Sequence, residues 1–140
     1  MYLAVRKSAT KEMKKYILAL MALALLTACK KEQKTGTEQV TPVAFEQEMK
    51  NDAGQLIDVR MPKEYNEGHI EGAKNLHIYD QDFQQRLDSL DKDETVYVYC
   101  KAGARSAEAV QVMEQKGFKH IVELEGGLDA WNQAGKPVAK

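Results

Sequence analysis

Cys100 is the residue best placed in this chain to act as a nucleophile. It follows residues 95–99, Thr-Val-Tyr-Val-Tyr, whose β-branched and aromatic side chains predict a buried strand, and a helical pattern begins a few residues later. The first N–H groups of a helix lack intrahelical partners, and the helix dipole is positive there. Both effects stabilise a thiolate over a thiol, so this placement predicts a reactive sulfur. The alternative is a buried structural cysteine, which is common in proteins.

The loop after Cys100 has a composition suited to binding an anion. Gly103 lets the backbone curl so that successive N–H groups converge on one anion, and Lys101 and Arg105 add positive charge if they point inward. We therefore expect a sulfur that carries or receives an anionic group, with Cys100 and Arg105 as the catalytic residues. The candidate substrate-binding residues are Lys101, Ala102, Gly103, Ala104, Ser106 and Arg60.

The other polar positions have structural interpretations. Asp58 is expected to tie the end of a strand to the following loop, and Arg60 is either a partner in a surface ion pair or a residue that flanks the pocket. None of the three histidines has metal-ligand spacing to another histidine or to Cys100, so we expect no metal and no other cofactor. Gly126-Gly127 lacks the full dinucleotide-binding fingerprint and predicts a turn.

Strand patterns and helical patterns alternate along the chain after residue 41. Such alternation predicts an α/β domain with a mainly parallel central sheet and helices on both faces. Ligands bind such sheets beyond the carboxyl ends of the strands, which is where Cys100 falls. The expected strands are 55–60, 75–78, 95–99 and 120–124. The expected helices are one that opens at Thr41-Pro42 and the segments 62–68, 80–90, 106–116 and 128–134.

The amino-terminal segment has the pattern of a bacterial export signal. Lys14 and Lys15 precede an apolar stretch over 16–26 that suits a signal peptide and is too short for an ordinary membrane span. Residues 26–29, Leu-Thr-Ala-Cys, resemble the lipobox of bacterial lipoproteins, in which the cysteine is lipidated and becomes the first residue. The alternative is an ordinary cleaved signal with an incidental Cys29. Translation starts at Met1 or at Met13.

Charge and composition limit the partners of the processed chain. The first 28 residues carry five basic and one acidic side chains of the chain's 20 and 21, so residues 29–140 have a side-chain net charge of −5. We expect no nucleic-acid partner, a monomer, and attachment to a bacterial membrane through acyl chains, facing the periplasm or the cell exterior. Residues 29–40 are expected to form a lipidated tether, its polar part spanning about 18 Å as a coil.

Four motifs give the chain a resemblance to the single-domain rhodaneses, a family of sulfurtransferases. Residues 100–106 match the active-site pattern Cys-x-x-Gly-x-Arg-Ser/Thr of that family. The other three motifs are the strand 56–60, the run 64–75 that contains Gly-His-Ile-Glu-Gly-Ala, and the carboxyl-terminal signature at 125–131 and 135–138. The resemblance covers residues 41–138, after the signal peptide 1–28 and the tether 29–40. It implies a three-layer rhodanese-like domain.

The resemblance also implies a reaction. The Cys100 thiolate would take the outer sulfur of a small donor such as thiosulfate, and the resulting persulfide would lie among the loop N–H groups. A thiol or cyanide would then accept the sulfur. Arg105 would support the loop as much as the substrate, by pairing with a carboxylate such as Asp58 or Glu64, and Lys101 would attract an anionic donor.

Three other functions remain open on the sequence. Cysteine-based phosphatases and arsenate reductases have five residues between cysteine and arginine, whereas four separate Cys100 from Arg105 here. A second possibility is a carrier module that holds a persulfide for a partner and turns over little by itself. The third is a redox thiol, although with Cys29 lipidated the chain offers Cys100 no resolving cysteine.

Overall fold

The computed structural model describes residues 2–25 and 34–140, which belong to two units, 1–33 and 34–140. In the first unit, helix α1 (Tyr2–Leu25) leaves its apolar side chains at Tyr16, Leu18 and Leu20 exposed. None of the described helices is both long and apolar enough to cross a membrane. The lipobox-like residues 26–29 lie outside the described residues.

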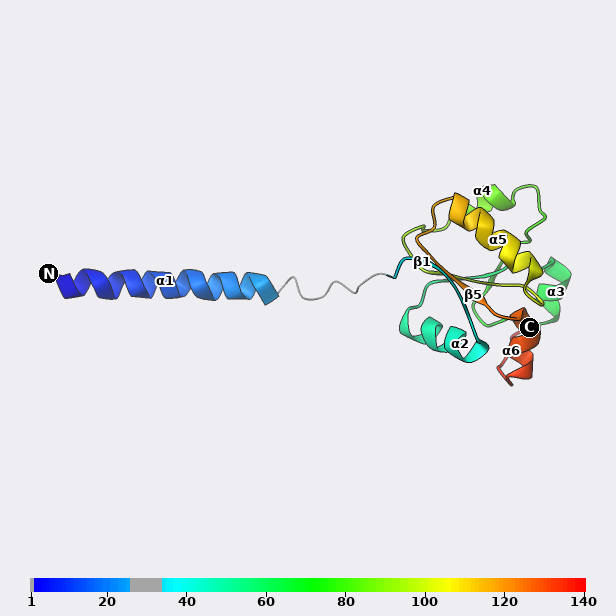
Figure 1. The fold of residues 1–140 in the computed structure, drawn as a ribbon, viewed down its shortest axis with the longest axis horizontal. Helices are drawn as coiled ribbons and strands as arrows, with labels where there is room; N and C mark the ends of the chain where they lie inside the picture. The colour runs from blue at the N-terminus through cyan, green and yellow to red at the C-terminus, as the bar shows by residue number, and fades with distance from the viewer. Residues whose placement is uncertain (1, 26–33) are drawn as a thin grey trace. The chain divides into compact units, whose positions relative to one another are not determined.

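The second unit is built on a five-stranded sheet in which every pair of neighbouring strands is parallel (Figure 1). The strand order is β1-β5-β4-β2-β3, so the central strand β4 lies between β5 and β2. The strands are β1 (Gly36–Val40), β2 (Gln55–Asp58), β3 (Lys74–Asn75), β4 (Val96–Tyr99) and β5 (His120–Leu124).

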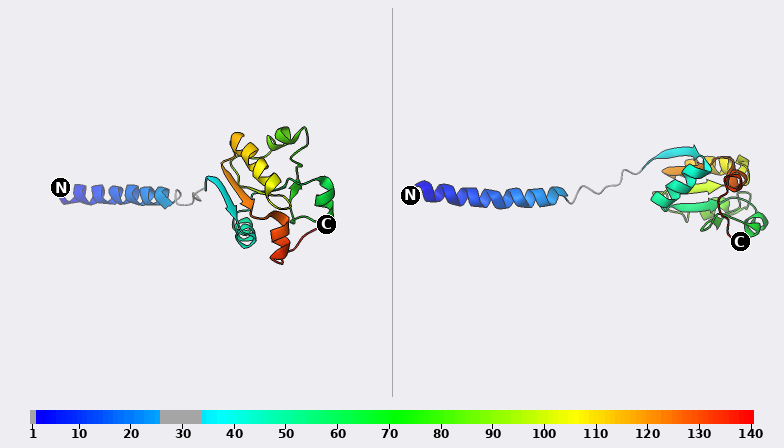
Figure 2. Two further views of the ribbon diagram at one scale, coloured as in Figure 1. Left: turned by 45° about the vertical axis from the view of Figure 1, so that its right-hand side comes forward. Right: turned by 90° about the horizontal axis from the view of Figure 1, so that it is seen from below.

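Helices cover both faces of this sheet (Figures 1 and 2). On one face, α2 (Pro42–Asn51) and α6 (Gly127–Gln133) pack Phe45 and Trp131 against β4 and β5. On the other, α4 (Phe83–Leu87) and α5 (Ala104–Gln115) enclose a second core cluster. The short α3 (Pro62–Glu67) follows β2. The predicted three-layer α/β architecture is confirmed.

The pattern of β4 explains why this strand lies at the centre. All four of its residues are buried, with Tyr97 and Tyr99 in one core cluster and Val96 and Val98 in the other. Strands buried on both faces need such continuous apolar runs. Cys100 directly follows β4, so the thiol lies at the carboxyl edge of the sheet, as predicted.

The expected tether over residues 29–40 is wrong for its last part. Gly36–Val40 form the edge strand β1, which pairs along its whole length with β5. The Glu38 carboxylate also accepts a hydrogen bond from His120 Nε2 at 2.9 Å, which lowers the pKa of Glu38. An edge strand has one partner and one solvated side, so its polar residues give no strand signal. The folded domain therefore begins before residue 41.

Two other elements are shorter than the sequence predicts. The strand expected over 75–78 consists only of Lys74–Asn75, and the helix expected over 80–90 is regular only at 83–87. Beyond β3 the chain still follows β2, because the N–H groups of Leu76 and Ile78 donate to Asp58 O and Val59 O. The apolar periodicity in these segments reflects burial in turns as well as in regular structure.

Candidate active site

The loop between β4 and α5 places the Cys100 sulfur at the start of a helix. Cys100 is 1% exposed and carries a free thiol. Gly103 adopts a φ of 114°, which other residues rarely adopt, and this turn brings its N–H to 3.0 Å from Cys100 Sγ. The 12-residue helix α5 begins at the next residue. The sulfur thus accepts a backbone hydrogen bond at the positive end of a helix, which favours a thiolate.

Other N–H groups of the loop are available to an anion. The N–H groups of Lys101, Ala102, Ala104 and Arg105 have no acceptor among the described residues. A row of backbone donors beside a sulfur is suited to an anionic ligand. Of the loop's N–H groups, that of Gly103 contacts the sulfur, and the convergence of the others on one anion stays a prediction.

Helix α6 holds the carbonyl side of the same loop. Leu128 N–H donates to Cys100 O at 2.8 Å, and Asp129 N–H donates to Lys101 O at 3.0 Å. Gly127 allows this approach, because a Cβ there would lie 2.5 Å from Cys100 O. The turn predicted at Gly126-Gly127 is correct, but its contact with the loop is not visible in the sequence. Gly127 is therefore a functional residue that the sequence analysis missed.

Arg105 joins the loop to α3. Its guanidinium donates to both oxygens of Glu64, at 2.7 and 2.9 Å. These hydrogen bonds lower the pKa of Glu64 to about 2 and raise that of Arg105. Of the two carboxylates suggested as partners of Arg105, Glu64 is right and Asp58 is wrong. The pair supports the architecture of the loop.

Asp58 instead forms a buried ion pair with Arg60. The Arg60 side chain donates to Asp58 through Nε and Nη2, the latter at 2.6 Å, and also to Gly68 O at 2.7 Å. Arg60 N–H donates to Asp58 Oδ1, so Asp58 does tie the end of β2 to the next loop. Because Arg60 is only 4% exposed, its interpretation as a surface ion-pair residue is wrong. Its assignment as a substrate-binding residue that flanks the pocket stays a prediction.

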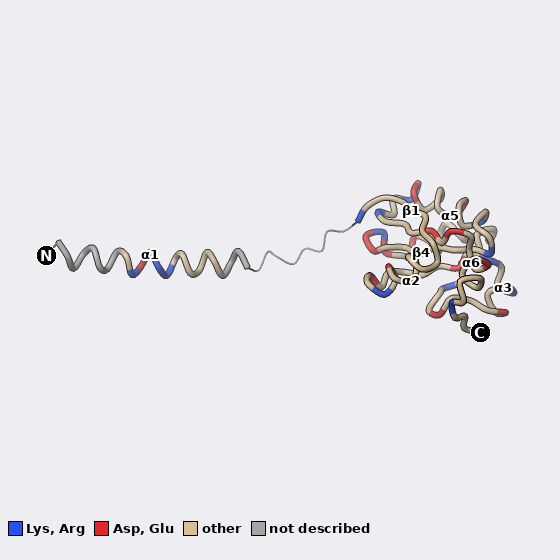
Figure 3. Tube along the Cα trace, turned by 60° about the horizontal axis from the view of Figure 1, so that its bottom comes forward, with Lys and Arg blue, Asp and Glu red and all other residues tan. Residues whose placement is uncertain are grey.

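Lys101 lies on the outside of the loop. Its ammonium group contacts both carboxylate oxygens of Asp129 at 2.8 Å, and both side chains are exposed. Ala102 and Ala104 are exposed on the rim of the loop. Figure 3 shows Lys and Arg interspersed with Asp and Glu over residues 34–140, not gathered on one element. The loop's two cations are therefore both paired with carboxylates from other elements.

Ser106 lies behind the sulfur and leads to a buried carboxylate. The Cys100 thiol donates to Ser106 Oγ at 3.5 Å, and Ser106 Oγ lies 2.7 Å from Glu123 Oε1. Ser106 is fully buried. Glu123 is a second residue that the sequence analysis missed. The sequence feature that could have revealed it is an acidic residue inside the apolar strand predicted over 120–124.

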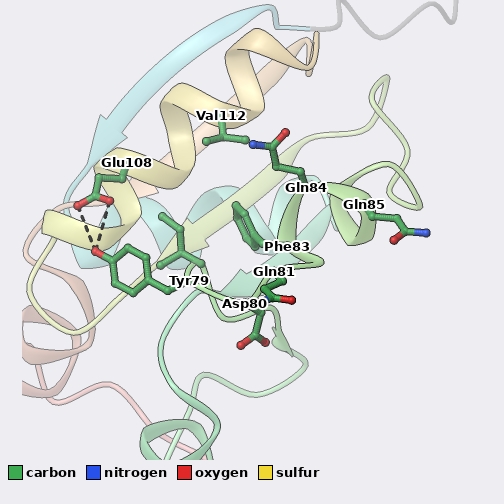
Figure 4. A pocket seen from close by; sticks show the side chains of 9 residues that line it. Tyr79, Asp80, Gln81, Phe83, Gln84, Gln85, Glu108 and Val112 are labelled. Atoms are coloured by element: carbon green, nitrogen blue, oxygen red, sulfur yellow. Dashed lines mark hydrogen bonds between the residues drawn. The ribbon is translucent and has the colours of Figure 1, made fainter.

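A groove of about 510 Å³ lies beside α5 and includes residues of the α4 region (Figure 4). Tyr79 and Glu108 line it, and Figure 4 shows the Tyr79 hydroxyl directed at the Glu108 carboxylate, at 3.2 and 3.3 Å. Burial and then the Glu108 charge raise the pKa of Tyr79. Glu108 lies in the second turn of α5, so the groove is close to the loop that carries Cys100.

A single thiol in a loop of backbone donors, at the carboxyl edge of a parallel sheet, defines a thiol-dependent group-transfer domain. The chain belongs to the rhodanese-like family, whose domain model, described as "Rhodanese-like domain", matches residues 41–134.

Known proteins support this assignment. The uncharacterized protein YqhL of Bacillus subtilis is 41% identical over 86 residues, covering 61% of this chain and 65% of YqhL, slightly less than two thirds. Thiosulfate sulfurtransferase PspE of Escherichia coli is 39% identical over 74 residues, covering 51% of this chain and 68% of PspE. A crystal structure of a rhodanese-related protein from Thermoplasma volcanium has a TM-score of 0.65 and 31% identity, covering 73% of this chain and 97% of that one. These similarities support membership of the rhodanese-like family.

Proposed function

We propose that this protein transfers sulfane sulfur through a persulfide on Cys100, from a donor such as thiosulfate to a thiophilic acceptor. The observation that carries the proposal is the Gly103 N–H at 3.0 Å from Cys100 Sγ, in a loop whose neighbouring N–H groups have no acceptor among the described residues. Backbone N–H donors beside the thiol are suited to stabilise the anionic outer sulfur of a persulfide.

The reaction balances without an external oxidant. The Cys100 thiolate attacks the outer sulfur of thiosulfate, the S–S bond of the donor breaks, and sulfite leaves with the bonding electron pair. The new persulfide carries its negative charge on the outer sulfur. Cyanide or a thiolate then attacks that sulfur, and the bond to Cys100 breaks to return the thiolate.

Intact mass spectrometry tests this proposal on the purified protein. After incubation with thiosulfate, we expect one added sulfur atom on the wild type and none on Cys100→Ser. Cyanide should then remove the added sulfur and form thiocyanate. A wild type that gains no sulfur from thiosulfate or from a low-molecular-weight persulfide would contradict the proposal.

We further propose that the enzyme is a lipoprotein anchored through Cys29 and facing the periplasm or the cell exterior. The support is the order of basic residues, apolar stretch and Leu-Thr-Ala-Cys at 26–29. Acyl chains add about 0.8 kcal/mol per buried CH₂, so two or three of them give stable attachment.

A persulfide carrier with little turnover of its own is the second candidate. The observation that favours it is that Lys101 and Arg105 are neutralised by Asp129 and Glu64, which weakens attraction for a small anionic donor. Steady-state thiosulfate:cyanide turnover separates the two candidates. A carrier would load sulfur and deliver it to a partner without measurable turnover.

A further inference from the structure

Glu123 is a carboxylate buried on an otherwise apolar face. It lies on β5, two residues from Ile121, on the side of the sheet that α5 covers, and is 6% exposed. Its hydrogen-bond partners are Ser106 Oγ at 2.7 Å and Gln39 Nε2 at 3.4 Å. No Lys, Arg or His of the described residues lies within ion-pair distance of it. A buried carboxylate without a cation is costly, so this one calls for a functional explanation.

The single hydroxyl proton of Ser106 links this carboxylate to the sulfur. Three acceptors surround Ser106 Oγ: Glu123 Oε1 at 2.7 Å, Gly103 O at 3.0 Å and Cys100 Sγ at 3.5 Å. An ionised carboxylate is both the nearest and the strongest of these acceptors, so the Ser106 hydroxyl donates its hydrogen bond to Glu123. Ser106 then presents a lone pair to Cys100. That lone pair accepts a hydrogen bond from a thiol and repels a thiolate.

The opposite arrangement arises when Glu123 is protonated. Its O–H donates to Ser106 Oγ, which frees the hydroxyl proton to stabilise a thiolate on Cys100. The step between the two arrangements is a proton transfer without change of oxidation state. The S–H bond breaks with its electron pair left on sulfur, its proton goes to Ser106 Oγ, and the former hydroxyl proton goes to Glu123.

We propose that Glu123 is a positioning residue for Cys100, acting through Ser106. Its ionised carboxylate holds the sulfur as a thiol, and its protonated form releases the thiolate. The other charged groups near the sulfur have partners outside the loop: Arg105 binds Glu64, Lys101 binds Asp129, and Glu108 binds Tyr79. Glu123 is thus the ionisable group that, among the described residues, is joined to the sulfur through a hydrogen-bonded hydroxyl.

The inference rests on the proposed function for its catalytic consequence. Cys100 is the leaving group when an acceptor takes the outer sulfur of the persulfide. A group that disfavours the thiolate slows this discharge, so ionised Glu123 makes the persulfide longer lived. Glu123→Gln should therefore discharge its sulfur faster than the wild type.

The rate of Cys100 alkylation by iodoacetamide against pH tests the link directly. Glu123→Gln removes the like charge, and its amide N–H can donate to Ser106, so the hydroxyl proton turns toward sulfur. We expect the alkylation rate of this variant, plotted against pH, to shift by about one pH unit toward acidic pH. On the rising part of the curve this means about tenfold faster alkylation than in the wild type. Glu123→Leu, which suits the apolar face, should shift the profile in the same direction. Glu125→Gln removes an exposed charge from the next loop and should leave the profile unchanged.

A double-mutant cycle separates the link through Ser106 from a simple charge effect. In a Ser106→Ala background, the shift caused by Glu123→Gln should fall below half its size. A Glu123→Gln profile that superimposes on the wild type, or a shift of equal size without the hydroxyl, overturns the inference. Alkylation needs no sulfur transfer. A protein that alkylates as expected but gains no sulfur overturns the proposed function alone.

Discussion

At the scale of single residues, the site depends on which carboxylate each arginine binds. Arg60 and Asp58 are two residues apart and form a buried pair at the end of β2. Arg105 and Glu64 are 41 residues apart and join the first turn of α5 to α3. Both pairs have direct guanidinium–carboxylate hydrogen bonds, but only the second holds the loop that carries Cys100. Loss of Glu64 should therefore loosen this loop without touching the sulfur.

The stabilisation from Glu64 should depend on pH in a defined window. Its pKa falls from 4.5 to about 2 in the folded protein, chiefly because of Arg105. A carboxyl group whose pKa is lowered by folding stabilises the folded state at pH values above its unfolded pKa. This stabilisation is lost as the pH falls through its folded pKa. We expect Glu64→Gln to lower the free energy of unfolding by about 1 kcal/mol at pH 7, with the difference vanishing between pH 4.5 and 2. Urea unfolding at several pH values measures it.

Glu67→Gln is the matched control for this experiment. Glu67 ends the same helix and is exposed. Its substitution should leave the pH dependence of unfolding unchanged. A Glu64→Gln effect that persists undiminished at pH 2 would show that the ion pair is not its source.

At the scale of elements, the loop is held between two helices. Helix α5 supplies N–H groups on the sulfur side, and α6 binds the carbonyl groups of Cys100 and Lys101 on the other side. Each carbonyl fixed by α6 sets the orientation of the peptide plane that follows it. The direction of the free N–H groups thus depends on the contact between α6 and the loop, and the glycine at its start makes this contact possible.

Gly127→Ala should displace the loop. Gly127 has a φ of 60°, and an added Cβ would lie 2.5 Å from Cys100 O and 2.6 Å from Lys101 O. These are backbone atoms, so the loop itself must move. We expect persulfide formation to fall at least tenfold and unfolding free energy to drop by about 3 kcal/mol, more than the 1–2 kcal/mol cost of a left-handed conformation alone. Single-turnover sulfur loading and denaturant unfolding provide the two readouts.

Gly135→Ala separates backbone strain from the contact with the loop. Gly135 has a similar φ of 70°, but nothing lies within 4 Å of an added Cβ. This variant should lose stability only by the conformational cost and should load sulfur at the wild-type rate. Equal loading rates in the two variants would mean that α6 does not set the loop geometry.

Across the whole molecule, the apolar strands and helices could be predicted from the sequence. The pairing of the polar edge strand and most contacts between distant polar side chains could not. The buried runs at 95–99 and 120–124 and the glycine after Cys100 are local signals, so the sheet and the loop follow from them. Strand β1 is polar and exists because β5 offers it an edge. The sequence offers both Asp58 and Glu64 as partners of Arg105, and the fold selects Glu64. The contact of Ser106 with Glu123 joins segments 17 residues apart and is visible only in the folded arrangement of helix and strand.

Membrane attachment and sulfur chemistry are expected to depend on different parts of the chain. Residues 34–140 form a unit with its own core, and Cys29 is not part of it. Cys29→Ser should therefore abolish membrane attachment while leaving thermal unfolding and Cys100 alkylation unchanged. Detergent-free fractionation of cells measures the attachment, with Cys100→Ser as the control that should stay with the membranes. If the Cys29→Ser protein still sediments with them, attachment has a source other than acylation at Cys29.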